Sequence, residues 1–127
     1  MRVALDTNRL TDFFRGDRGL EELLSNADEV WVPLVVLGEI KGGYRLGPRQ
    51  ALNEAALQRF LAKENVDVLL PDRDTAEYYA GLFAQLRRAG TPVPANDLWI
   101  ASSVLQHNLT LITRDRHFDR IPQLLLA

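Results

Sequence analysis

Short apolar runs alternate with helical segments along the whole chain, and this alternation constrains the fold more than any other feature. The apolar runs have the length and the β-branched content of buried strands. Because alternating strands and helices build a parallel sheet covered on both faces, we expect a three-layer α/β/α sandwich with a central, mostly parallel sheet of four or five strands. The expected strands are residues 2–6, 29–33, 66–71 and 109–113, with residues 122–127 as a short edge strand.

Local signals indicate where the helices begin and end. The stretch 34–47 is ambiguous because its valines suit a strand, but Pro33 before it and Glu39 within it favour a helix. Pro48 is predicted to open the next helix, since proline is favoured in a first helical turn.

The longest expected helix follows the third strand. Asp74 and Glu77 have the spacing of a helix cap and its capping-box partner. Gly90 is a typical helix end, because glycine adopts the left-handed conformation that terminates helices. A further apolar helix is expected after the proline-containing loop 91–97.

Length and composition limit the setting of the protein. A chain of 127 residues has the size of one domain. The chain has no cysteine, so disulfides and thiolate metal sites are excluded and any metal needs oxygen or histidine ligands. The first acid comes at position 6 and no apolar run is long enough to span a bilayer, so we expect no signal peptide, no membrane partner and a reducing, cytoplasmic location.

The charge does not by itself indicate a partner. The net charge of −2 does not predict nucleic-acid binding. The 13 arginines against two lysines reflect either the codon bias of a GC-rich genome or recognition of phosphate, which arginine binds with a planar fork.

Four acids stand at comparable junctions of strands and helices. Asp6 ends the first expected strand, and Asp115 follows the fourth by two residues. Asp97 opens the helix before that fourth strand, and Glu39 lies in the helix after the second. Because ligands of open α/β sheets bind beyond the C-terminal ends of the strands, the four carboxylates are expected to meet at one edge.

Each acid also has a simpler explanation. Asp6 could cap the following turn, and Asp97 could be a first-turn acid favoured by the helix dipole. Asp115 could form a surface ion pair with Arg114 or Arg116. Glu39 is expected to be buried among apolar neighbours and therefore to need a partner, either an arginine or a metal.

Taken together, the acids predict a metal site. Clustered carboxylates repel one another, and a hard divalent cation such as Mg²⁺ removes that repulsion. Such an ion keeps waters and substrate phosphate among its ligands, which suits hydrolysis of phosphodiester bonds.

The histidines and small polar residues have less specific roles. His107 is expected to interact with the C-terminal end of its helix, and His117 to be a solvated loop residue. Thr7, Asn8 and Thr113 are either caps and turn residues or supports that orient the carboxylates.

Four short motifs occur in order along nearly the whole chain: "LDTN" at residues 5–8, "LGEI" at 37–40, "ANDLWIA" at 95–101 and "LTLITRDRHF" at 109–118. Together they resemble the PIN-domain ribonucleases, and among these the VapC-type toxins of prokaryotic toxin–antitoxin pairs. The first motif is weak alone, whereas the last two at this spacing are specific.

The resemblance implies a PIN-like fold that binds Mg²⁺, or Mn²⁺ as a substitute, and cuts RNA to leave a 5′-phosphate and a 3′-hydroxyl. It also implies a homodimer and a small VapB-like antitoxin that inserts a segment into the acidic pocket. The positions that match the acidic quartet are Asp6, Glu39, Asp97 and Asp115, with Thr7, Asn8 and Thr113 as polar support.

The chain departs from the family pattern at two places. Some members have a further acid two residues after the fourth, where this chain has His117, and Asp119 is out of register. Arg9 stands where many relatives have an apolar residue, and contact with phosphate is the one role we assign to it.

We therefore expect one PIN-like nuclease domain over residues 1–127 that acts as a metal-dependent endoribonuclease. By the resemblance it is a toxin that blocks translation by cutting tRNA or rRNA. Asp6, Asp97 and Asp115 are expected to bind the main metal, while Glu39 binds a second ion or activates water. The candidates for contact with RNA phosphates are Arg9, Lys41, Arg45 and Arg116.

Two alternatives remain. A non-catalytic RNA- or protein-binding module could keep a PIN-like fold, although the presence of all four acids argues against it. A phosphate-switch receiver domain also has acids at strand ends, but it needs a lysine after a late strand, where this chain has Arg114.

Overall fold

The computed structural model describes residues 1–127, which form five strands, six α-helices and one short 3-10 helix. The strands are β1 (Arg2–Leu5), β2 (Glu29–Pro33), β3 (Val66–Leu69), β4 (Thr110–Ile112) and β5 (Leu125–Leu126). The helices are α1 (Thr7–Phe14), α2 (Arg18–Ser25), α3 (Leu34–Leu46), α4 (Gln50–Leu61), α5 (Arg73–Ala89), α6 (Ala95–Gln106) and the 3-10 helix η1 (Arg116–Arg120).

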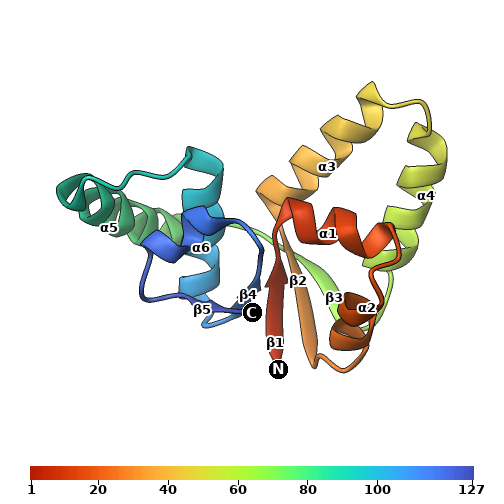
Figure 1. Ribbon diagram of the computed structural model, residues 1–127, viewed down its shortest axis with the longest axis horizontal. Helices are drawn as coiled ribbons and strands as arrows, with labels where there is room; N and C mark the ends of the chain where they lie inside the picture. Colours follow the sequence, from red (N-terminus) through yellow and green to blue (C-terminus); the bar gives the residue numbers. More distant parts are fainter.

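All five strands belong to one sheet in the order β3-β2-β1-β4-β5, and every neighbouring pair is parallel. Helices α1 to α4 lie on one side of the sheet and α5 and α6 on the other (Figure 1). The expected α/β sandwich is therefore confirmed, with five strands. The expected edge strand at the end of the chain shortens to the two residues of β5.

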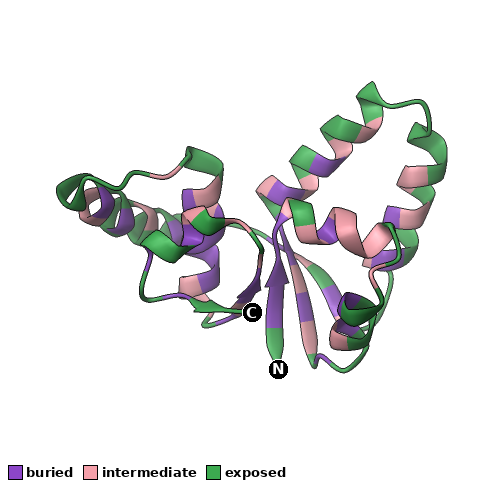
Figure 2. Ribbon diagram, viewed as in Figure 1, coloured by how far each residue is buried: buried purple, intermediate pink, exposed green.

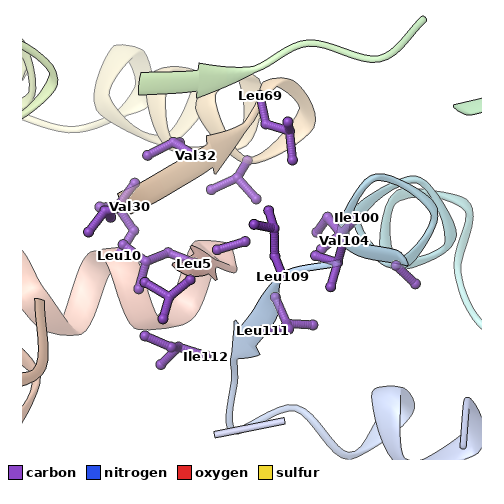
Figure 3. Close-up of a cluster of buried hydrophobic side chains, with 14 of the residues drawn as sticks. Leu5, Leu10, Val30, Val32, Leu69, Ile100, Val104, Leu109, Leu111 and Ile112 are labelled. Atoms are coloured by element: carbon purple, nitrogen blue, oxygen red, sulfur yellow. The ribbon is translucent and has the colours of Figure 1, made fainter. Parts of the chain in front are cut away.

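The core lies on both faces of β1, the central strand. Val3, Ala4 and Leu5 are fully buried, as expected of a parallel strand covered by helices on both sides. Figure 2 shows that the buried residues concentrate along the sheet and on the helix surfaces that face it. Figure 3 shows Leu10 of α1 and Val104 of α6 among the apolar side chains that gather around the strands.

The ambiguous stretch after β2 is the helix α3, as Pro33 and Glu39 favoured. The prediction for Pro48 is wrong, because this proline lies in the turn and α4 begins at Gln50. The turn from α3 ends only at Arg49, whose backbone serves as the N-cap.

The predicted capping box of α5 is also wrong. Asp72 is the N-cap, and its carboxylate accepts a hydrogen bond from the backbone nitrogen of Thr75 at 3.0 Å. The same carboxylate accepts a bond from Gln106 at the end of α6, and this tertiary contact favours Asp72 over Asp74 as the cap. Gly90 ends α5 in the left-handed conformation, with φ of 72°, as predicted.

The strand order places the C-terminal ends of β1 and β4 next to each other. The chain leaves β1 toward β2 on one side, and β4 returns to pair with β1 on the other. Ligands of open α/β sheets bind at such a switch point, beyond the C-terminal ends of the strands. None of the helices combines the length and the apolar character needed to cross a membrane.

Candidate metal centre

Asp6 connects the end of β1 to α1 and is held in place by two hydrogen bonds. Its Oδ1 atom accepts a bond from the backbone nitrogen of Arg9 at 2.9 Å, so Asp6 is the N-cap of α1. Its Oδ2 atom accepts a bond from the hydroxyl of Thr113. The strand register pairs Leu5 with Ile112, so Asp6 and Thr113, which follow them, lie side by side. Asp6 is only 4% exposed, and its carboxylate has little freedom to move.

Three further side chains lie together where α6 begins and β4 ends. Asp97 is in the first turn of α6, and Asp115 is the N-cap of η1. The Nδ1 atom of His117 is 2.9 Å from Oδ2 of Asp97 and 3.4 Å from Oδ1 of Asp115. One donor atom from each of the three residues lies within 4.8 Å of the others.

His117 was expected to be a solvated loop residue, and its side chain is 41% exposed, but its ring also contacts Asp97, and its backbone nitrogen donates a hydrogen bond to the Asp115 carboxylate at 2.9 Å. The simpler alternative for Asp115, a surface ion pair with a neighbouring arginine, is not seen. Arg114 pairs with Asp12 at 2.9 Å, and Arg116 lies 3.8 Å from Asp119.

Thr113 links the two parts of the centre. Its hydroxyl donates to the Asp6 carboxylate and accepts a hydrogen bond from the backbone nitrogen of Asp115 at 3.0 Å. The threonine therefore acts as a support for two carboxylates at once, one of the two roles that the sequence left open.

The acids influence one another electrostatically. Burial raises the pKa of Asp6 above its ordinary value and outweighs the opposing hydrogen bonds from Thr113 and Arg9. Burial also raises the pKa of Asp97, and the negative charges of Asp115 and Glu39 add to this effect. The hydrogen bond and charge of His117 oppose the rise in the pKa of Asp97, and the charge of Arg114 opposes that of Asp6, but burial outweighs both.

Glu39 lies at the edge of the centre and is exposed, contrary to the expectation that it is buried. Val36 and Ile40 form the buried, apolar face of α3, and Glu39 lies beside that face. Its partner is the hydroxyl of Thr7, 2.9 Å from Oε1, and not an arginine. Thr7 and Asn8 are the first two residues of α1 and not its caps; Thr7 instead orients Glu39, and Asn8 is exposed.

The donor set fits a divalent cation. Adjacent ligands of an ion bound at about 2.1 Å in an octahedron lie about 3 Å apart, close to the separations of His117 from the two aspartates. Oxygen and imidazole donors together suit Mn²⁺ and its neighbours, and oxygen donors suit Mg²⁺. Asp97, Asp115 and His117 would hold the ion, with Asp6 beside them.

The four residues expected to contact RNA phosphates differ in their availability. Arg9 pairs with Asp12 at 3.1 Å, and Lys41 pairs with Glu54 of α4 at 2.9 Å. Arg45, in the last turn of α3, is exposed, and the Arg116 side chain is 94% exposed. His107 is the C-cap of α6, at the opposite end of that helix from Asp97.

The PIN domain family model matches residues 3–124 of the chain. This chain belongs to the PIN-domain family. It is homologous to the VapC ribonucleases of type II toxin–antitoxin systems.

Two relatives and one solved structure document this homology. Ribonuclease VapC2 of Rickettsia felis is 30% identical over 106 residues, which are 83% of this chain and 78% of the relative. Ribonuclease VapC4 of Mycobacterium tuberculosis is 34% identical over 95 residues, 72% of this chain and 70% of the relative. The structure of VapBC2 from Rickettsia felis, bound to a DNA fragment from their promoter, aligns over 100% of this PIN domain and 98% of the matched chain, with a TM-score of 0.88 and 27% identity.

Proposed function

We propose that this PIN domain is a metal-dependent endoribonuclease and the toxin of a toxin–antitoxin pair. The observation that carries the proposal is the cluster of Asp97, Asp115 and His117, of which one donor atom each lies within 4.8 Å of the others, with Asp6 linked to Asp115 through the Thr113 hydroxyl. Homology to VapC ribonucleases supports RNA as the substrate.

The residues of the centre have different roles. Asp97, Asp115 and His117 would hold the divalent ion, Mg²⁺ or Mn²⁺, and Asp6 would add negative charge beside it. When bound, the ion supplies positive charge beside the attacked phosphate and lowers the pKa of the attacking water. The imidazole of His117 favours Mn²⁺ more than an all-oxygen site would.

Glu39 stands apart from these ligands and suits a different step. Its exposed carboxylate, oriented by the Thr7 hydroxyl, accepts the proton of the attacking water or holds a second ion. Attack on the phosphorus with departure of the 3′ oxygen leaves a 5′-phosphate on one fragment and a 3′-hydroxyl on the other.

The cellular role follows from the relatives. We propose that the substrate is tRNA or rRNA, so that cleavage blocks translation. The solved neighbours are toxin–antitoxin complexes, such as VapBC-1 from nontypeable Haemophilus influenzae and VapBC from Salmonella typhimurium bound to DNA. We therefore propose that a small VapB-like antitoxin controls this chain and that the toxin acts as a homodimer.

The test compares two matched substitutions of aspartate. Protein free of antitoxin is incubated with total tRNA and rRNA in Mg²⁺, Mn²⁺ or EDTA, and fragment ends are mapped. Asp97→Asn is expected to lower cleavage about 100-fold or more. Asp119→Asn removes the same charge from an exposed residue whose one ion pair is with Arg116, and should cut like the parent.

The outcomes separate the candidates. Discrete cuts that need metal and Asp97 support the ribonuclease. Unchanged cleavage by a folded Asp97→Asn protein rejects the metal site. A well-folded parent that cuts neither tRNA nor rRNA in any metal favours the non-catalytic binding module.

A further inference from the structure

A pocket with no hydrophobic residue in its lining adjoins the metal centre. It lies between the turn that joins α1 to α2 and the loop after β4, and its volume is about 520 Å³. We call it the arginine pocket; its lining residues are Arg9, Asp12, Arg15, Gly16, Asp17 and Arg114. Three arginines against two aspartates give it a net positive charge, in a protein whose net charge is −2.

Asp12 organises the arginines of this pocket. Its carboxylate accepts hydrogen bonds from Nε and Nη2 of Arg114, at 2.9 and 3.3 Å, and from Nη1 of Arg9 at 3.1 Å. Arg9 also lies 3.5 Å from Asp17, the N-cap of α2. Asp12 and Asp17 balance the charges of Arg9 and Arg114, so the net positive charge of the pocket comes from Arg15, which is exposed.

Arg114 is the arginine of this group that is both exposed and held in place by an ion pair; Arg15 is exposed too, but no hydrogen bond or ion pair fixes its guanidinium. The Arg114 side chain is 59% exposed, whereas those of Arg9 and Asp12 are 23% and 17% exposed. Two of the five N–H donors of Arg114 point to the Asp12 carboxylate, and Nη1 of Arg114 has no partner. The guanidinium is thus held in position by Asp12 while the rest of its fork faces solvent.

The arginine pocket is joined directly to the metal centre. Arg114 stands between Thr113, which binds Asp6, and Asp115. On the other side, the backbone nitrogen of Arg9 donates a hydrogen bond to the Asp6 carboxylate, while the Arg9 side chain lines the pocket. A strand of RNA whose phosphate lies at the metal centre therefore passes next to the pocket when it runs toward α1.

We propose that the arginine pocket binds a backbone phosphate of the RNA beside the one that is cut, and that Arg114 holds it. This inference rests on the proposed ribonuclease function. A planar guanidinium fork matches a phosphate, and a pocket without apolar residues offers little to a protein segment. Among the arginines near the centre, the structure assigns this role to Arg114 and gives Arg9 the task of supporting Asp12.

The decisive experiment scans single phosphates of the RNA. A short oligonucleotide around the mapped cut site is made with one neutral methylphosphonate at each position in turn, and kcat and KM are measured. At one position next to the cut, the parent should lose about three- to tenfold in kcat/KM, mainly through KM. Arg114→Gln should show the same loss with the normal RNA and no further loss at that position.

Two other variants serve as comparisons. Arg88→Gln removes the same charge at the end of α5, on the other side of the sheet, and should keep the parent's sensitivity at every position. Arg114→Lys keeps the charge without the fork and should recover part of the loss. The salt dependence of RNA binding should weaken by about 0.7 in the log–log slope for Arg114→Gln, the value for one phosphate on a single strand.

Results that overturn the proposal are distinct from those that overturn the function. If the parent cuts RNA and Arg114→Gln retains its sensitivity to every methylphosphonate, the arginine pocket binds no substrate phosphate, while the ribonuclease stands. If Arg114→Gln cuts normally but binds the antitoxin poorly, the pocket serves the protein partner instead. If the folded parent cuts no RNA, the proposed function fails and the pocket proposal fails with it.

Discussion

Thr113→Val tests the claim that one hydroxyl organises two carboxylates. Valine has nearly the same shape as threonine, so the change removes the hydrogen bonds to Asp6 and from Asp115 without opening a cavity. Hydrogen bonds to charged groups contribute about 1.5–3 kcal/mol each when buried, and a neutral one contributes about 1 kcal/mol. Because Thr113 is only half-buried, water replaces part of this, and we expect a loss of about 2 kcal/mol.

The loss should appear in two independent measurements. Urea unfolding in EDTA should give the lower free energy of unfolding, and the midpoint of thermal unfolding should fall by roughly 6–10 °C. Calorimetric titration with Mn²⁺ should show about tenfold or greater weakening, since residues that orient metal ligands have effects of this size. Thr113→Ser retains the hydroxyl and should remain close to the parent in both.

The reasoning would be refuted by a specific pattern. If Thr113→Val and Thr113→Ser unfold at the same urea concentration and bind Mn²⁺ equally, the hydroxyl does not hold the two carboxylates. A loss of stability with unchanged Mn²⁺ affinity would restrict Thr113 to a structural role.

Three further predictions concern the fold. Phe118→Ala removes a ring that is 1% exposed and should cost about 3–5 kcal/mol in urea unfolding, whereas a loss below about 1 kcal/mol would contradict its burial. Gly90→Ala places a side chain at φ of 72°, where its Cβ meets no atom, so the cost of about 1 kcal/mol in thermal unfolding is backbone strain alone. Hydrogen bonds from Gln106 and Thr75 lower the pKa of Asp72, so its contribution to stability is complete above about pH 4 and is lost as the pH falls through the lowered pKa. Asp72→Asn should therefore flatten the decline of stability between about pH 5 and 2 in acid titrations followed by circular dichroism, and an unchanged decline would show that other acids cause it.

The sequence was sufficient for the sheet. Strand ends of a parallel sheet share one edge, so Asp6 and Asp115 were expected to be neighbours, and Thr113 links them; the candidate metal cluster, however, consists of Asp97, Asp115 and His117, without Asp6 or Glu39. Asp97 joined them because a helix that returns to such a strand begins at the same edge. These inferences depend on topology, which the alternation of strands and helices determines.

Side-chain directions depended on contacts that the sequence does not reveal. The ring of His117 faces Asp97 from a short 3-10 helix that Asp115 caps, although its side chain remains 41% exposed. Glu39 could have been placed correctly, since a helix turns it about 100° from Ile40, which is buried. The cap of α5 was decided by Gln106, a residue more than thirty positions away from Asp72.

The pairing of β1 with β4 also bears on when the protein becomes active during its synthesis. Asp6 is translated more than a hundred residues before Thr113 and Asp115, which complete its surroundings. Contacts of such long range form late in folding, after the intervening segments are available. A nascent chain therefore carries an incomplete metal centre for most of its translation. The centre can assemble only after β4 and the loop that follows it have left the ribosome.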